Sequence, residues 1–291
     1  MASLKDVQMK ITGVKKTKQI TKAMNMVASA KLRGAQQRIE RFRPYADKFY
    51  GMLTDLAGKA DEGAHPLLEV REEVKTVAIL LCTSDRGLCG SFNSNMINTA
   101  LRLARAKKAE GKQVKFYCVG KKGRDTVRRE GFDLAQAWAD QMNAFDFTLA
   151  NNVGMTLINA YLEGVVDEVT IVFGQFVSMA RQEPITLQVL PIGTAEKAEE
   201  AASGQSEYIY EPDVVGLLAE LLPRFVKVQV YRGLLDTSAS EHAARMSAMD
   251  NATRSCDDMI HALTLLYNKT RQAAITTELM DIVSGAEALK G

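Results

Sequence analysis

The chain has 291 residues, of which 46% are hydrophobic and 25% charged, and its formal net charge is only +2 at pH 7. This length and composition allow a buried core and about two domains. No run of 18 or more apolar residues occurs and the N-terminus lacks an apolar signal region, so we expect neither a membrane span nor export.

Two seven-residue series run in phase through residues 4–56. The first is Leu4, Ile11, Lys18, Asn25, Leu32, Ile39, Ala46 and Leu53, and the second is Val7, Val14, Thr21, Ala28, Ala35, Phe42, Phe49 and Leu56. Such spacing keeps one seam of a helix turned toward a partner helix. Residues 1–58 are therefore predicted to form one long coiled-coil helix.

A matching seam occurs near the C-terminus, within the predicted helical region 208–291. Its two series are Leu218, Phe225, Arg232, Ala239, Met246, Thr253, Ile260 and Tyr267, and Leu221, Val228, Leu235, His242, Met249, Cys256 and Leu263. Two long helices at opposite ends of a chain pair most simply as an antiparallel coiled coil. An ordinary helical hairpin would satisfy this pattern as well.

Positive charge is concentrated in the first helix. Residues 1–50 contain twelve Lys/Arg and three Asp/Glu, a net charge of +9. Such a segment is typical of a helix that meets an acidic partner, a membrane surface or nucleic acid, although a solvated basic face is the plainer interpretation. Lys18, Thr21 and Asn25 also occupy consecutive seam positions, where polar residues weaken a two-helix seam while fixing its register.

The middle of the chain alternates between strand-like and helix-like segments. Strands are predicted at residues 74–82, 114–119, 169–177 and 185–190, and helices at 95–109, 121–130 and 148–162. Strands that are apolar on both faces and alternate with helices indicate a largely parallel sheet. We therefore expect a Rossmann-like α/β domain over residues 74–193, inserted between the two coiled-coil helices.

Few residues of the chain suggest catalysis. It carries neither a P-loop nor a GxGxxG motif, and the three histidines lie in separate segments. The four cysteines, Cys82, Cys89, Cys118 and Cys256, lack CxxC spacing and are expected to be buried, reduced thiols of a cytosolic protein.

One loop, residues 83–93 (TSDRGLCGSFN), follows the first predicted strand. Ligands often bind beyond the carboxyl ends of parallel strands, so this loop is a candidate ligand site. Alternatively it is a tight turn, with Gly87 and Gly90 supplying the backbone conformations and Asp85 bonding main-chain amides.

Three separated segments carry a family resemblance. Residues 20–28 (ITKAMNMVA) with 31–33 (KLR), residues 85–90 (DRGLCG), and residues 267–279 (YNKTRQAAITTEL) with 282–286 (IVSGA) appear in the same order as in a known family. By these motifs the chain resembles the gamma subunit of the bacterial F-type ATP synthase over essentially its whole length.

The resemblance implies a non-catalytic central stalk of a rotary motor. The chain would couple hydrogen ion transport through the membrane c ring to ATP synthesis at the beta subunits of the F1 part, the CF(1). Its implied partners are the ring of alternating alpha and beta subunits, the epsilon subunit and the c ring, without cofactor, metal or nucleic acid. Its implied location is peripheral, on the cytoplasmic side of the cell inner membrane.

The resemblance also implies individual contact residues. Beta-subunit loops would touch Met24, Arg271, Gln272, Thr276 and Glu278. The foot, toward the c ring and epsilon, would include Tyr208, Tyr210 and Glu211. At Thr277 family members often carry glutamine, so no role is assigned there. The chain also lacks the cysteine-bearing insertion of the chloroplast forms.

Two other classes of function stay open from the residues alone. A basic coiled coil is also typical of a nucleic-acid-binding scaffold, whose affinity for DNA would fall steeply with salt. The α/β alternation is also compatible with a small-molecule enzyme, which would bind a nucleotide as an isolated chain.

Overall fold

The computed structural model describes residues 3–57, 65–69, 71, 73–192 and 214–288. Its chain separates into two compact units, Ser29–Arg245 on the one hand and Met1–Ala28 with Met246–Gly291 on the other. Two long helices, α1 (Leu4–Ala57) and α6 (Val214–Ala288), contribute residues to both units. We describe each unit by itself.

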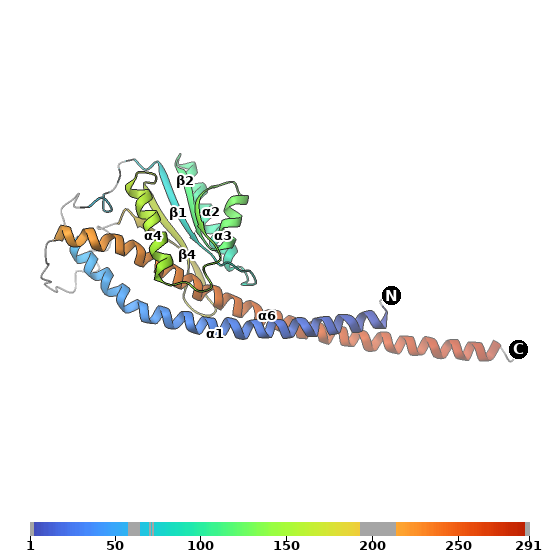
Figure 1. The fold of residues 1–291 in the computed structure, drawn as a ribbon. Coiled ribbons are helices and arrows are strands. Elements are labelled where there is room, and N and C mark those ends of the chain that lie inside the picture. Colours follow the sequence, from blue (N-terminus) through green and yellow to red (C-terminus); the bar gives the residue numbers. More distant parts are fainter. Residues whose placement is uncertain (1–2, 58–64, 70, 72, 193–213, 289–291) are drawn as a thin grey trace. The chain divides into compact units, whose positions relative to one another are not determined.

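The unit Ser29–Arg245 contains a five-stranded sheet with the order β3-β2-β1-β4-β5 (Figure 1). Its strands are β1 (Thr76–Cys82), β2 (Gln113–Val119), β3 (Asp133–Trp138), β4 (Glu168–Phe176) and β5 (Gln182–Leu190). The pairs β1–β2, β1–β4 and β2–β3 are parallel, and β4–β5 is antiparallel. The predicted largely parallel sheet is confirmed, with β3 as a strand that the sequence reading missed.

Three shorter helices connect the strands: α2 (Phe92–Ala109), α3 (Lys121–Arg129) and α4 (Phe147–Leu162). Alternate residues of β1 divide between the two faces of the sheet. Val77, Ile79 and Leu81 pack with Phe92 and Met96 of α2 in one apolar cluster. Helices α2 and α3 therefore cover one face, and α4 lies across the other (Figure 1).

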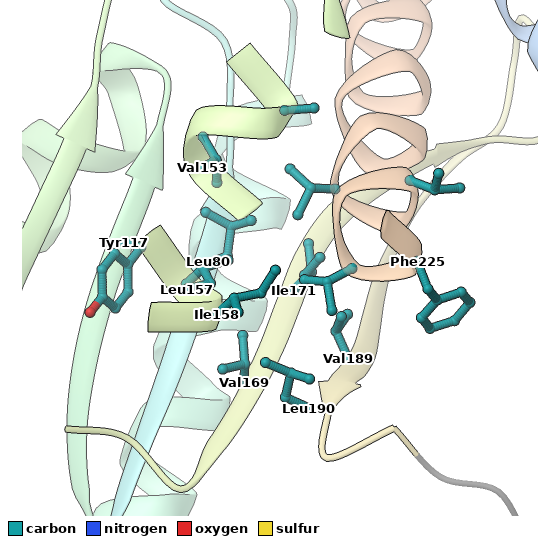
Figure 2. Close-up of a cluster of buried hydrophobic side chains, with 14 of the residues drawn as sticks. Leu80, Tyr117, Val153, Leu157, Ile158, Val169, Ile171, Val189, Leu190 and Phe225 are labelled. Carbon is teal, nitrogen blue, oxygen red and sulfur yellow. The ribbon is translucent and has the colours of Figure 1, made fainter. Parts of the chain in front are cut away.

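The second face carries the larger cluster. Leu80 of β1 and Ile171 of β4 lie beneath Val153 and Leu157 of α4, and Phe225 of α6 borders the same cluster (Figure 2). At roughly 25 cal/mol per Å² of apolar surface removed from water, this burial is a large contribution to stability. Helix α6 is thus part of the core of this unit as well as a partner of α1.

Two contacts fix α6 against the sheet unit. A Cβ built on Gly154 of α4 would lie 2.8 Å from Cγ of Lys227, so only glycine allows this approach. In β4, the carbonyl of Gly174 accepts a hydrogen bond from Ser240 Oγ at 2.9 Å, and its N–H donates to Thr237 Oγ1 at 3.4 Å. Side chains of α6 thus bond the β4 main chain beyond the last residue paired with β1.

Helices α1 and α6 pair antiparallel within Ser29–Arg245. The rings of Phe42 and Tyr231 meet edge to face at 4.9 Å between centroids, and Tyr50 lies 6.1 Å from Phe225. Residue numbers therefore rise along α1 in the direction in which they fall along α6. The predicted fold class, α/β with long antiparallel terminal helices, is confirmed. The domain boundaries at residues 1–58, 74–193 and 208–291 stay a prediction, because residues 58, 193 and 208 lie outside the described part of the chain.

Candidate interaction surface of the terminal helices

In the unit Met1–Ala28 with Met246–Gly291, α1 and α6 also run antiparallel, and polar contacts join them. The hydroxyls of Thr21 and Thr253 are 2.8 Å apart, and Asn25 Nδ2 donates to the carbonyl of Met246 at 2.8 Å. Lys18 forms an ion pair with Asp257 in which both side chains are largely exposed. Surface pairs of this kind contribute about 1 kcal/mol at most.

Apolar burial in this unit is sparse. Among its described residues, those that are more than nine-tenths buried are Val7, Thr21, Ala28 and Met249. Several large apolar side chains face outward instead. On α1 the exposed ones are Met9, Ile20, Met26 and Val27, each more than half exposed.

The last part of α6 lies beyond the start of α1. A register that places Thr21 opposite Thr253 puts Leu4, the first residue of α1, opposite about residue 270. Residues 271–288 continue as helix past that point, and every one of them is exposed (Figure 1). They include the tip stripe, which we define as Ile275, Leu279 and Ile282, spaced by four and three residues and 46%, 57% and 68% exposed.

The predicted beta-contact residues all lie on these helices but do not converge. Met24 is partly exposed on α1, whereas Arg271, Gln272, Thr276 and Glu278 are exposed on α6. By the same register Met24 lies opposite about residue 250, so Arg271 is about 30 Å farther along the axis at ~1.5 Å per residue. The predicted contact residues therefore form two separate regions rather than one site. Tyr208, Tyr210 and Glu211 lie outside the described residues.

The loop after β1 lies where an open α/β sheet would bind a ligand, and its own residues fill that place. Asp85 Oδ1 accepts from the main-chain nitrogens of Lys121 at 2.9 Å and Asp140 at 2.8 Å, and Oδ2 accepts from that of Met142 at 2.9 Å. The Asp85 carboxylate thus occupies the N-terminus of α3, where a phosphate would otherwise be held. This agrees with a turn in which Asp85 bonds main-chain amides.

Further bonds hold the same loop from two other helices. Ser84 Oγ donates to Arg86 O at 2.6 Å, and Asn93 of α2 bonds Ser84 through both its amide atoms. Arg245 of α6 donates to Gly87 O at 3.1 Å. Gly90 has a positive φ of 57°, as expected for this turn, whereas the other positive φ of the loop, 63°, is found at Leu88 and not at Gly87.

The remaining chemical candidates give no reaction centre. In the part of the chain that the structure describes, no three His, Cys, Asp or Glu residues group as metal ligands, and no helix is long and apolar enough to cross a membrane. Cys82, Cys89 and Cys118 are buried free thiols, and burial raises the pKa of Cys118 to about 12. These cysteines are therefore protonated and unreactive at neutral pH.

Sequence comparison identifies the family. The family described as ATP synthase matches residues 3–289, and the chain is 74% identical over the full length of both proteins to the ATP synthase gamma chain of Nitratidesulfovibrio vulgaris strain Hildenborough. The chain belongs to the ATP synthase gamma-chain family. The gamma chain of Maridesulfovibrio salexigens is 70% identical, again over the full length of both proteins.

Solved structures support the gamma-chain fold. A chain in the OSCP/F1/c-ring structure of the Euglena gracilis mitochondrial ATP synthase has a TM-score of 0.69 and 21% identity. The match covers 98% of this chain and 94% of that chain. A chain in the Tetrahymena thermophila central stalk and c-ring structure has a TM-score of 0.62 and 26% identity, covering 80% of this chain and 99% of its own. As a gamma-chain homologue, the protein is a non-catalytic subunit of the ATP synthase, as the sequence predicted.

The sequence revealed the motif at residues 85–90, but it did not show that Asn93 and Arg245 bond this loop. Arg245 is more than 150 residues away along the chain and carries no local signal, so its bonds to the loop could be found only in the structure.

Proposed function

We propose that this gamma chain is the central rotor shaft of a proton-translocating F-type ATP synthase. Its paired terminal helices turn inside the ring of alternating alpha and beta subunits. The rotation couples ion flow through the membrane c ring to conformational change at the catalytic sites of the beta subunits.

The tip stripe is the observation that carries this proposal. Ile275, Leu279 and Ile282 are about half or more exposed. They lie on the segment of α6 that extends past the start of α1. Exposing such side chains to water is unfavourable, by ~25 cal/mol per Å² of apolar area. An enclosing ring of subunits provides the missing cover. An axle in such a ring also has little need of deep apolar packing of its own, which suits the sparse burial of this unit.

Coupling needs no catalytic residue in the shaft. A single asymmetric axle gives three chemically identical beta subunits different neighbours at any instant. A contact shifts a site between states only by its difference in free energy between them, at ~1.4 kcal/mol per tenfold in affinity. Met24 in one region, and Arg271, Gln272, Thr276 and Glu278 in the other, are the contacts we assign to beta-subunit loops.

A further proposed contact region is the foot of the shaft. We assign Tyr208, Tyr210 and Glu211 to contacts with the c ring and the epsilon subunit. The chain then resides on the cytoplasmic side of the bacterial inner membrane and touches the membrane only through the complex.

Co-purification tests this function. A tagged chain expressed in its own cells is expected to bring down alpha, beta and epsilon subunits together. A variant with Ile275→Asp, Leu279→Asp and Ile282→Asp should lose alpha and beta while its circular dichroism stays that of the wild type. A matched variant with three exposed apolar residues of the other unit changed, Leu162→Asp, Val177→Asp and Met179→Asp, should retain them. Recovery of the tagged wild-type chain without alpha and beta, or with DNA in a salt-sensitive complex, would refute the proposal.

A further inference from the structure

The contacts between α1 and α6 in the unit Met1–Ala28 with Met246–Gly291 raise the question of what fixes their register. Hydrophobic attraction has no direction, and both seams repeat every seven residues, so sliding by one heptad again brings seam positions together. The packing here is weak as well, since few of its described residues are fully buried. Within this unit, then, apolar packing does not by itself select one register.

We infer that Thr21, Asn25 and Thr253 form a polar clasp that sets this register and thereby positions Met24. This inference deepens the proposed shaft function and rests on it only for its consequence at Met24. Thr21 and Asn25 flank Met24 on α1, one turn apart, and both reach α6. They are positioning residues, since each acts on Met24 through the placement of the helix.

The threonine pair is specific to a single register. Along the α1 series the neighbours of Thr21 are Val14 and Ala28, and along the α6 series those of Thr253 are Met246 and Ile260. A slip of one heptad therefore sets the Thr21 hydroxyl against Met246 or Ile260 and the Thr253 hydroxyl against Val14 or Ala28. Thr21 is only 8% exposed, so in a slipped register its hydroxyl would lie against an apolar neighbour and keep only the bond to Lys18 O of its own helix.

Asn25 contributes differently. Its amide donates to a main-chain carbonyl, and carbonyls recur at every turn of α6, so this bond alone tolerates a slip. It requires, however, that this face of α1 stays turned toward α6. The threonine pair therefore fixes the axial register, and Asn25 fixes the rotational setting of α1 about its axis.

The two hydroxyl protons allow the clasp two alternative hydrogen-bonding arrangements. Three short contacts involve the two hydroxyls: Thr21 Oγ1 to Lys18 O at 3.0 Å, Thr253 Oγ1 to Met249 O at 2.7 Å, and the two hydroxyls to each other at 2.8 Å. Each hydroxyl has one proton to donate, so only two of the three are hydrogen-bonded at once. The cross-helix bond forms when either hydroxyl releases its own carbonyl. Serine at both positions preserves this chemistry and valine removes it.

Spin-label distances in the isolated full-length chain test the clasp without using the rotor function. Labels replace Lys22 and Lys269, which are both exposed, in a chain carrying Cys256→Ser. A slip of one heptad changes the separation of the two labels along the helix axis by about 10 Å. We expect one distance in the wild type and in Thr21→Ser with Thr253→Ser. In Thr21→Val with Thr253→Val, a second, shifted distance should appear beside the first.

The matched control is Thr17→Val, because the Thr17 hydroxyl donates only to Gly13 O of its own helix. It should keep the wild-type distance. A single, unchanged distance in the double valine variant overturns the inference. A distance distribution that is equally broad in Thr17→Val or in the wild type overturns it as well.

The consequence at Met24 is measured in assembled, reconstituted complexes. The double valine variant should pump fewer protons per ATP hydrolysed than the wild type, and the double serine variant should restore the ratio. An unchanged ratio in a chain whose register has shifted would overturn the positioning role of the clasp. Failure of the wild-type chain to assemble at all would instead count against the proposed function, and the distance measurement would still decide the clasp.

Discussion

Asp85 Oδ1 lies 2.9 Å from the main-chain nitrogen of Lys121, so a side chain that follows β1 caps the first turn of α3. The same carboxylate also accepts from the nitrogens of Asp140 and Met142, beyond β3. Gly120, just before α3, has φ of 98°, and a Cβ there would lie 2.1 Å from Thr83 O. One aspartate and one glycine thus join the carboxyl ends of three neighbouring strands.

Replacing Asp85 should therefore destabilise the sheet unit. Asp85→Ala leaves three main-chain N–H groups without their charged acceptor, and we expect a loss of about 2–4 kcal/mol in the free energy of unfolding. Asp85→Asn keeps an oxygen acceptor and should cost less. Urea unfolding of the full chain measures both. Asp125→Ala, which removes an exposed partner of Arg124, is the control and should stay within about 0.5 kcal/mol. Equal stability of Asp85→Ala and Asp125→Ala would contradict this role.

His242 should make the chain sensitive to acid. Burial, together with the nearby cations Arg245 of α6 and Lys31 and Arg38 of α1, lowers its pKa from 6.5 to about 4. Between pH 6.5 and about 4, the unfolded chain binds a proton at His242 that the folded chain does not bind. The stability present above pH 6.5 is therefore lost as the pH falls through about 4.

The matched variant for that titration is His242→Gln, which cannot be protonated. Between pH 7 and pH 4 the wild type should lose roughly 3 kcal/mol more in free energy of unfolding than the variant, at ~1.4 kcal/mol per pKa unit. Urea unfolding at several pH values gives the difference, and ring-proton NMR gives the pKa directly. A His242 resonance that titrates near pH 6.5 would disprove the prediction.

Met24 is expected to tolerate small or apolar residues but not lysine. The surrounding helix already carries Lys18 and Lys22, and a further cation there would hold an acidic group of a beta-subunit loop. Met24→Lys should therefore lower the number of protons pumped per ATP hydrolysed more than it lowers hydrolysis. Met26→Lys, at a position 59% exposed on the same helix, provides the comparison. Identical pumping ratios for wild type and Met24→Lys would remove Met24 from the contact.

Arg271 and Gln272 are expected to act on turnover rather than on folding. Both are exposed in the chain alone, so their replacement should change its stability by less than about 0.5 kcal/mol. Arginine grips a carboxylate with two parallel hydrogen bonds that lysine cannot form, so Arg271→Ala should slow ATP hydrolysis more than Arg271→Lys. Lys269→Ala, two residues before Arg271, is the exposed control. Wild-type rates of hydrolysis and synthesis in assembled Arg271→Ala, Gln272→Ala complexes would show that these contacts carry no function.

The regular elements could be predicted because their causes are local. The heptad spacing from Leu4 to Leu53 places Ala28, Leu32 and Ala35 on the buried seam, and the apolar run of β1 reflects a strand covered on both faces. Strand β3 was missed for the same reason: it is an edge strand with mostly exposed or half-buried residues, so it lacks an apolar run.

The sequence alone determined the two helical seams, the parallel sheet and the family motifs, because periodicity and short motifs are properties of neighbouring residues. Tertiary structure decided which groups meet across long separations. It placed Thr253 on Thr21, Asp85 on the amides of α3, and Ser240 on Gly174. It also separated Met24 from Arg271 into two regions and left the tip stripe without an α1 partner. Hydrogen bonds depend on distances of about 3 Å between atoms, and such distances exist only once the chain has packed.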